Sequence, residues 1–100
     1  MPTGKGKSNR ESKKAERQFT VSNKLGLHAR PAALFVQTAN RFESNIEIHK
    51  DDLQVDGKSI MGIMTLAAEM GSLILVRATG KDAEAALDAL GKLIGSNFGE

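Results

Sequence analysis

Two different spacings of apolar residues follow one another in residues 18–42, QFTVSNKLGLHARPAALFVQTANRF. From Gln18 to Ser22, apolar and polar residues alternate, which is the pattern of a half-buried strand. From Ala29 to about Phe42 the apolar residues recur at helical spacing, and Pro31 stands early, where a missing N–H is tolerated. The helical stripe contains Ala32, Phe35, Val36, Ala39 and Phe42. We therefore expect a strand, a loop and a helix in this order.

The next segment favours a hairpin. Isoleucines alternate with polar residues in NIEIHK, residues 45–50, and apolar residues alternate again in LQV, residues 53–55. Asp51 and Asp52 between them are typical turn residues. The simplest interpretation is two antiparallel strands joined by a tight turn.

The last third of the chain predicts a short helix, a strand and a longer helix. The first runs from Ser59 to about Met70, the strand from Leu73 to Ala78, and the last helix from Lys81 to Ile94. The last helix has one apolar stripe: Ala83, Ala86, Leu87, Leu90 and Leu93. The order is thus βαββαβα, which favours an α+β fold with helices on one face of a mostly antiparallel sheet and water on the other.

Charge divides the chain into two parts. The whole protein has 100 residues and a formal net charge of +2. Residues 1–17 carry six Lys or Arg and two Glu, and they contain almost no apolar side chain to bury. We predict a flexible basic N-terminal tail over 1–17 and a single folded domain over 18–100. A solvated extension is the simpler interpretation of the tail, and nucleic-acid binding through it is the remote alternative.

Composition narrows the classes of function further. The chain has no cysteine, so a disulfide framework and a thiolate metal site are excluded. No signal peptide or membrane-spanning run is visible, which favours the cytoplasm. One hundred residues form one modest domain, too small for a deep substrate cleft, which disfavours a self-contained enzyme.

A histidine at the start of the first helix carries the most interesting chemistry. The segment from Gly26 to Pro31 reads GLHARP, so His28 lies where unpaired backbone N–H groups and the helix dipole favour an anion. An imidazole nitrogen can attack a phosphoryl group, and Arg30 offers a forked donor for the phosphate oxygens. The alternative is a purely structural role, in which His28 only caps the helix.

Two longer motifs favour the chemical role of His28 over the structural one. Residues 23–39, NKLGLHARPAALFVQTA, and residues 57–72, GKSIMGIMTLAAEMGS, resemble the histidine-containing phosphocarrier (HPr) proteins of the phosphoenolpyruvate-dependent phosphotransferase system. The resemblance implies an open-faced sandwich of four antiparallel strands and three helices, with no cofactor. It makes His28 the residue phosphorylated on Nδ1 and Arg30 its supporting arginine. Enzyme I would then be the donor, an EIIA-type protein the acceptor, and the carrier a monomer.

The second motif places a serine at the start of the second helix. Ser59 precedes an apolar helical run and is a good N-cap. The resemblance adds a regulatory role, because the KSIMG context is that of the serine phosphorylated by HPr kinase. Cap and regulatory site are compatible, since a phosphate is tolerated at a helix N-terminus while its charge would alter partner choice.

The same helix has more apolar residues than one stripe needs. Ile63, Leu66 and Ala67 fall on one side, whereas Ile60, Met61 and Met64 occupy an adjoining arc. We expect the second arc to be an exposed partner-binding patch, because flexible methionines suit several partners. A wider core stripe is the alternative.

Other features leave part of the function open. His49 lies on a polar phase of a strand, and two histidines without cysteine give no metal site. Leu25 stands where many sugar-transport members have a small polar residue, a form shared with nitrogen-related regulatory carriers. The sequence therefore leaves two destinations for the phosphate, an imported sugar or a regulatory protein.

Overall fold

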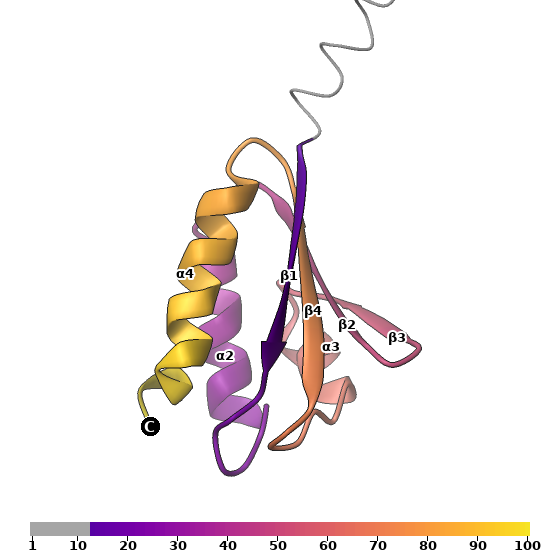
Figure 1. Ribbon diagram of the computed structural model, residues 1–100, viewed down its shortest axis with the longest axis vertical. Coiled ribbons are helices and arrows are strands. Elements are labelled where there is room, and N and C mark those ends of the chain that lie inside the picture. The colour runs from indigo at the N-terminus through magenta and orange to yellow at the C-terminus, as the bar shows by residue number, and fades with distance from the viewer. Residues whose placement is uncertain (1–12) are drawn as a thin grey trace, which may run out of the picture.

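The computed structural model describes residues 13–100, and Figure 1 shows a sheet with helices packed against it. The elements follow the predicted order βαββαβα, with a short 3-10 turn at the end. Their bounds are β1 (Lys14–Thr20), α2 (Ala29–Ala39), β2 (Asn45–Lys50), β3 (Leu53–Asp56), α3 (Ile60–Thr65), β4 (Leu73–Thr79), α4 (Ala83–Gly95) and η1 (Asn97–Gly99). No helix in this range is long and apolar enough to cross a membrane.

The four strands form one antiparallel sheet in the order β1-β4-β2-β3. Helices α2 and α4 lie side by side over one face of it (Figure 1). Alternate residues of the two central strands are buried beneath the helices: Ile46, Ile48, Ile74, Val76 and Ala78. The other alternate positions remain exposed or half-buried, and Arg77 Nε donates to Glu16 Oε2 at 2.6 Å among them. The predicted α+β fold with an open sheet face is confirmed.

The core lies between the sheet and the helices. Its largest fully buried side chains include Phe35 on α2, Ile63 on α3, and Leu87 and Leu90 on α4. Each such side chain contributes about 1.5–3 kcal/mol by leaving water. The helical stripes predicted from the sequence are therefore what fixes the helices on the sheet.

The first strand begins earlier than predicted. Strand β1 starts at Lys14 rather than Gln18, so residues 14–17, expected in the tail, are paired with β4. Lys14 pairs with Thr79 and Thr20 with Leu73, and every residue of β4 thereby has a partner. Arg17 also binds Glu84 and Asp88 on α4. The rest of the tail predicted over 1–17, residues 1–12, lies outside the described part of the chain.

The short helix ends earlier than predicted. Helix α3 stops at Thr65 instead of continuing to about Met70, because Ala67 has a left-handed backbone with φ of 51°. The following residue turns its carbonyl toward another loop, where Ala68 O accepts from Leu27 N at 2.9 Å. Helix α4 likewise begins at Ala83, one residue after its N-cap Asp82, rather than at Lys81.

Candidate functional site

His28 is the N-cap residue of α2. Its backbone is extended, with φ of −79° and ψ of −168°, and its carbonyl accepts from Ala32 N at 2.9 Å. Its side chain makes no capping hydrogen bond. Capping by the backbone alone leaves the imidazole available for chemistry, at the end of an 11-residue helix whose dipole favours an anion.

The loop before His28 is held by the loop that follows α3. Gly26 has φ of 71°, and a Cβ at this position would collide with the carbonyl oxygen of Ala68. Leu27 N donates to the same oxygen, which draws the two loops together. The backbones of the two loops thus approach closely at Gly26, and alanine would be both strained and obstructed there.

Asn23 fixes the same loop from inside. Its side chain is buried, and its Nδ2 donates to Gly26 O at 2.6 Å. Sequence reasoning assigned no role to this residue. A buried asparagine three residues before a glycine in a tight loop is a recognisable turn signal, since asparagine side chains bond to nearby backbone.

The two ring nitrogens of His28 differ in their surroundings. Nε2 is shielded from solvent and forms no hydrogen bond within residues 13–100, and Glu100 Oε2 lies 3.4 Å from it. The imidazole as a whole remains about one third exposed, with a side-chain exposure of 36%. No sequence pattern indicated Glu100, which is 72 positions away in the chain.

Arg30 follows His28 in the first turn of α2 and is exposed. It forms no ion pair with any described residue, so its guanidinium is not committed to a carboxylate. The structure shows no hydrogen bond between Arg30 and His28. A phosphate at the helix N-terminus would supply the group that both side chains share.

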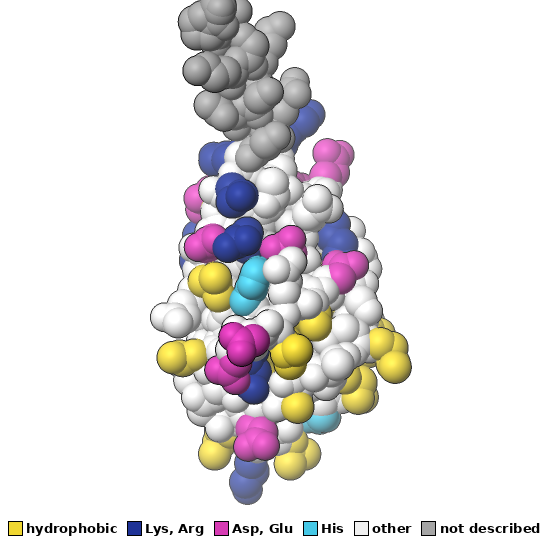
Figure 2. Space-filling view, turned by 90° about the vertical axis from the view of Figure 1, so that its right-hand side faces the viewer, with side chains coloured by type: hydrophobic (Ala, Val, Ile, Leu, Met, Phe, Trp, Pro, Cys, Tyr) yellow, Lys and Arg dark blue, Asp and Glu magenta, His cyan; other side chains and the backbone are white. Residues whose placement is uncertain are grey.

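Apolar side chains surround the histidine. A shallow hollow of about 270 Å³ is lined by His28 together with Leu25, Leu27, Met64, Ala67, Ala68 and Glu69. Leu25 is 73% exposed, Met61 76%, and Ile60 and Met64 just over 40%. In Figure 2 hydrophobic side chains are concentrated in the lower half of the face shown, below a region of mixed charge. We call Leu25, Ile60, Met61 and Met64 the apolar rim.

The predicted exposure of Ile60, Met61 and Met64 is confirmed, and the wider core stripe is wrong. Ile63 and Leu66 are buried as expected. Ala67 is exposed, contrary to expectation, because the helix has already ended before it. Leu25 joins the same surface from the loop before α2, which the sequence did not predict.

Ser59 is the N-cap of α3, as its position in the sequence predicts. Its Oγ accepts from Gly62 N at 3.0 Å, and its backbone is extended. The side chain is half-buried and directly precedes the rim residues Ile60 and Met61. A charge added at Ser59 would therefore lie at the border of the apolar rim.

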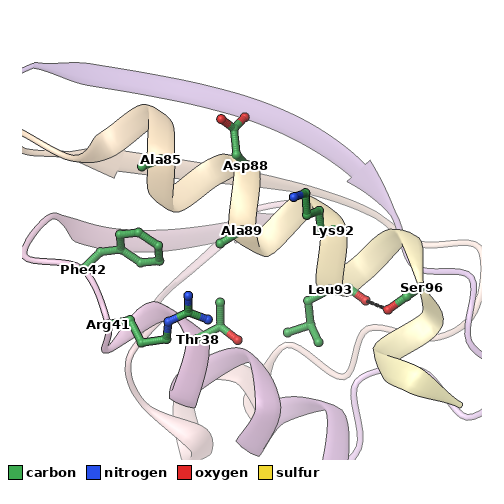
Figure 3. Close-up of a pocket in the computed structure, with 9 residues that line it drawn as sticks. All are labelled: Thr38, Arg41, Phe42, Ala85, Asp88, Ala89, Lys92, Leu93 and Ser96. Atoms are coloured by element: carbon green, nitrogen blue, oxygen red, sulfur yellow. Dashed lines mark hydrogen bonds between the residues drawn. The ribbon is translucent and has the colours of Figure 1, made fainter.

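A second hollow, of about 590 Å³, lies between α2 and α4 (Figure 3). Arg41 and Lys92 line opposite sides of it, and Asp88 at its edge binds Arg17 at 2.8 Å. None of the residues predicted for the site lines this hollow. His49 does not line the hollow at His28, and its Nε2 lies 3.2 Å from Glu47 Oε1. Within residues 13–100 no three metal-ligating side chains come together.

An accessible histidine at a helix N-terminus, on a shallow surface with an apolar rim, defines a protein that carries a group between partners. The family model described as "PTS HPr component phosphorylation site" matches residues 15–96. The chain therefore belongs to the HPr family of phosphocarrier proteins, and it is a phosphoryl carrier rather than a self-contained catalyst.

Similar proteins support this membership over nearly the whole domain. The phosphocarrier protein HPr of Xylella fastidiosa is 47% identical over 85 residues, covering 85% of this chain and 96% of that protein. The HPr-like protein Crh of Bacillus subtilis is 48% identical over 75 residues, covering 75% and 88%. The crystal structure of HPr from Thermoanaerobacter tengcongensis superposes with a TM-score of 0.83 at 52% identity, covering 86% and 97%.

Proposed function

We propose that this protein accepts a phosphoryl group from phosphorylated enzyme I on Nδ1 of His28 and passes it to an EIIA-type acceptor in the cytoplasm. The observation that carries the proposal is the placement of His28. Its imidazole lies at the positive end of α2 and makes no capping hydrogen bond, and its Nε2 is the ring nitrogen shielded from solvent. Nδ1 is then the nitrogen left to react.

Arg30 supports the transferred group in this proposal. It stands in the first turn of the same helix and is exposed. Its forked donors match phosphate oxygens, whereas a lysine would offer only a point charge. Backbone N–H groups at the start of α2 add to this anion site.

The apolar rim is the surface on which partners dock. Two of its members, Leu25 and Met64, line the same hollow as His28, so a protein seated on the rim would bring its own phosphorylated residue close to His28. Large exposed apolar side chains are the usual anchors of such transient contacts. Phosphate on Ser59 would add about −1.5 to −2 charges beside the rim and thereby favour one class of partner over another.

The test uses the full chain with phosphoenolpyruvate and enzyme I. Wild type is expected to gain one acid-labile phosphate, and His28→Ala none. The Nδ1 assignment is read from the ³¹P–¹⁵N coupling of the labelled protein. An acid-stable label, or equal labelling of the variant, contradicts the proposal.

A regulatory phosphocarrier is the second candidate. Relatives named "HPr-like protein Crh" are 55% identical in Halalkalibacterium halodurans and 48% identical in Bacillus subtilis. Ser59, placed as the cap of α3 beside the rim, would be the target of an HPr kinase in this case. Incubating the chain with ATP and an HPr kinase, with Ser59→Ala as control, tests whether Ser59 is phosphorylated.

A further inference from the structure

Methionine is the most readily oxidised side chain in this protein. The chain has four methionines and no cysteine, tryptophan or tyrosine. An oxidant therefore meets no thiol that would react before the thioether sulfurs. Met61, Met64 and Met70 lie in the described part of the chain, and Met1 lies outside it.

The three described methionines are all on the surface. Met61 is the most exposed of them, and Met70 and Met64 are 60% and 42% exposed. The hydrophobic core of residues 13–100 contains no methionine. Oxidation of these sulfurs therefore adds a polar oxygen only where the side chains already meet water, so it should cost the fold little stability.

Two of the three methionines belong to the apolar rim. Met64 lines the hollow that contains His28, and Met61 lies three residues earlier on α3. Residues at this spacing are neighbours on the surface of a helix. The fully buried Ile63 holds α3 against the core, so both thioethers have a fixed place at the edge of the site. Met70 lies in the loop between α3 and β4 and does not line the hollow.

We propose that Met61 and Met64 are an oxidation-sensitive switch for docking on the apolar rim, an inference that rests on the proposed use of the rim by partners. The oxidant is hydrogen peroxide. A lone pair of the sulfur attacks one peroxide oxygen, the O–O bond breaks, and the second oxygen leaves as water with both protons. The sulfur is oxidised by two electrons and gains a bond to oxygen, while the peroxide is reduced.

The oxidised side chains are poor anchors for a partner. Methionine sulfoxide is polar, whereas the thioether is flexible and apolar. A protein seated on the rim would have to bury the new oxygen, at a free-energy cost unless it offers a hydrogen-bond donor there. Phosphorylation of His28 should therefore slow although the histidine itself is unchanged.

The modification is reversible. Methionine sulfoxide reductases remove the added oxygen as water while two thiols are oxidised to a disulfide, and one enzyme acts on each sulfoxide epimer. Because the core contains no methionine, the protein stays folded through both steps. Peroxide thus lowers the flow of phosphate through His28, and reduction restores it.

The test treats the full-length protein with hydrogen peroxide and removes the peroxide by desalting before enzyme I and phosphoenolpyruvate are added. Mass spectrometry of peptides identifies the methionines that carry oxygen. With Met61 and Met64 oxidised, we expect enzyme I to bind about fivefold more weakly, the scale of one contact residue in an interface. The melting temperature should not change, and both reductases with a dithiol should restore the transfer rate.

Met61→Leu combined with Met64→Leu removes both sulfurs and keeps apolar side chains of similar size. The transfer rate of this double variant after peroxide, divided by its own rate before treatment, should be close to one. Met70→Leu is the matched control, because it removes an exposed thioether outside the hollow. It should remain as sensitive to peroxide as wild type.

Three outcomes overturn the switch. The first is a double variant that loses as much of its rate as wild type, and the second is protection by Met70→Leu. The third is a loss of rate that persists after the reductases have removed the sulfoxides, since the damage then lies elsewhere.

The failure of this inference is distinguishable from that of the proposed function. If untreated wild type gains no acid-labile phosphate on His28, the carrier role is wrong whatever the methionines do. If untreated wild type is phosphorylated on His28, and the protein oxidised at Met61 and Met64 binds enzyme I and reacts equally well, only the switch is wrong.

Discussion

Ser59 Oγ accepts a hydrogen bond from Gly62 N at 3.0 Å, so the residue proposed as the regulatory site also caps α3. Because aspartate is an equally good N-cap, Ser59→Asp should preserve stability while adding charge beside the apolar rim. We expect slower phosphorylation of His28 by enzyme I with little change in melting temperature.

Ser59→Ala separates the two roles of this serine. It loses the cap and should cost about 1 kcal/mol of stability, yet transfer to His28 should stay near the wild-type rate. Denaturant unfolding and transfer kinetics on the two variants give the comparison. Equal transfer rates for Ser59→Asp and wild type would show that charge at Ser59 does not control docking.

Arg30→Ala should slow phosphoryl transfer about tenfold, because it removes a charged donor pair from the phosphate. The exposed side chain contributes little packing, so the melting temperature should not move. Arg41→Ala, which removes the same charge beyond the far end of α2, is the control. Quenched-flow measurement of both variants decides the matter, and identical rates would exclude Arg30 from the site.

Met61→Glu should weaken docking without unfolding the protein. The side chain is 76% exposed, so a substitution here should change stability by about 0.5 kcal/mol or less. Titration of enzyme I should show a higher Kd, and Leu53→Glu on the β2–β3 hairpin provides an exposed apolar control. A Kd equal to that of wild type would mean that partners do not use this part of the rim.

Asp82 should make stability depend on pH in the acid range. Hydrogen bonds from the Ser44 hydroxyl and from the backbone N–H groups of Glu43 and Ser44 lower the pKa of this carboxyl below its ordinary value of 3.8. A lowered folded-state pKa means that its stabilisation is fully present above the unfolded value and is lost as the pH falls through the folded one.

Melting curves between about pH 7 and pH 3 test this expectation. Asp82→Asn keeps a residue able to cap α4 but removes the titrating group. The difference in melting temperature between wild type and Asp82→Asn should be greatest near neutrality and should shrink on acidification below the ordinary pKa. A difference that is constant with pH would show that the carboxylate charge is not what stabilises this junction.

The regular spacing of apolar residues made most of the fold predictable. Apolar spacing alone located α2, β2, β4 and α4, since each of them buries one stripe of side chains. It also located β3, although Leu53 there is exposed and Val55 is half-buried. The start of β1 was missed because its first helix-facing positions are Ala15 and Arg17. Arg17 binds Glu84 and Asp88 on α4. In the sequence, a charged residue at this position indicates a solvated tail instead of a strand.

The candidate site was predictable only where it is local in sequence. His28 precedes one helix, Arg30 lies in the first turn of that helix, and Ser59 precedes another helix. Helix-start signals therefore predicted all three positions. The end of α3 was missed because a hydrogen bond between distant loops, Leu27 N to Ala68 O, competes with further helix. Glu100 was missed because the left-handed residues Asn97, Phe98 and Gly99 bring it back to His28, which no periodic pattern indicates.

The strand order β1-β4-β2-β3 has a consequence for how the protein is made. During synthesis from the N-terminus, β1 emerges first but its partner β4 is among the last elements to leave the ribosome. The loop that carries His28 also needs Ala68, whose carbonyl oxygen accepts from Leu27 N. A nascent chain thus contains His28 before the residues that hold its loop have been synthesised. A phosphate donor that meets the chain at this stage finds no assembled acceptor.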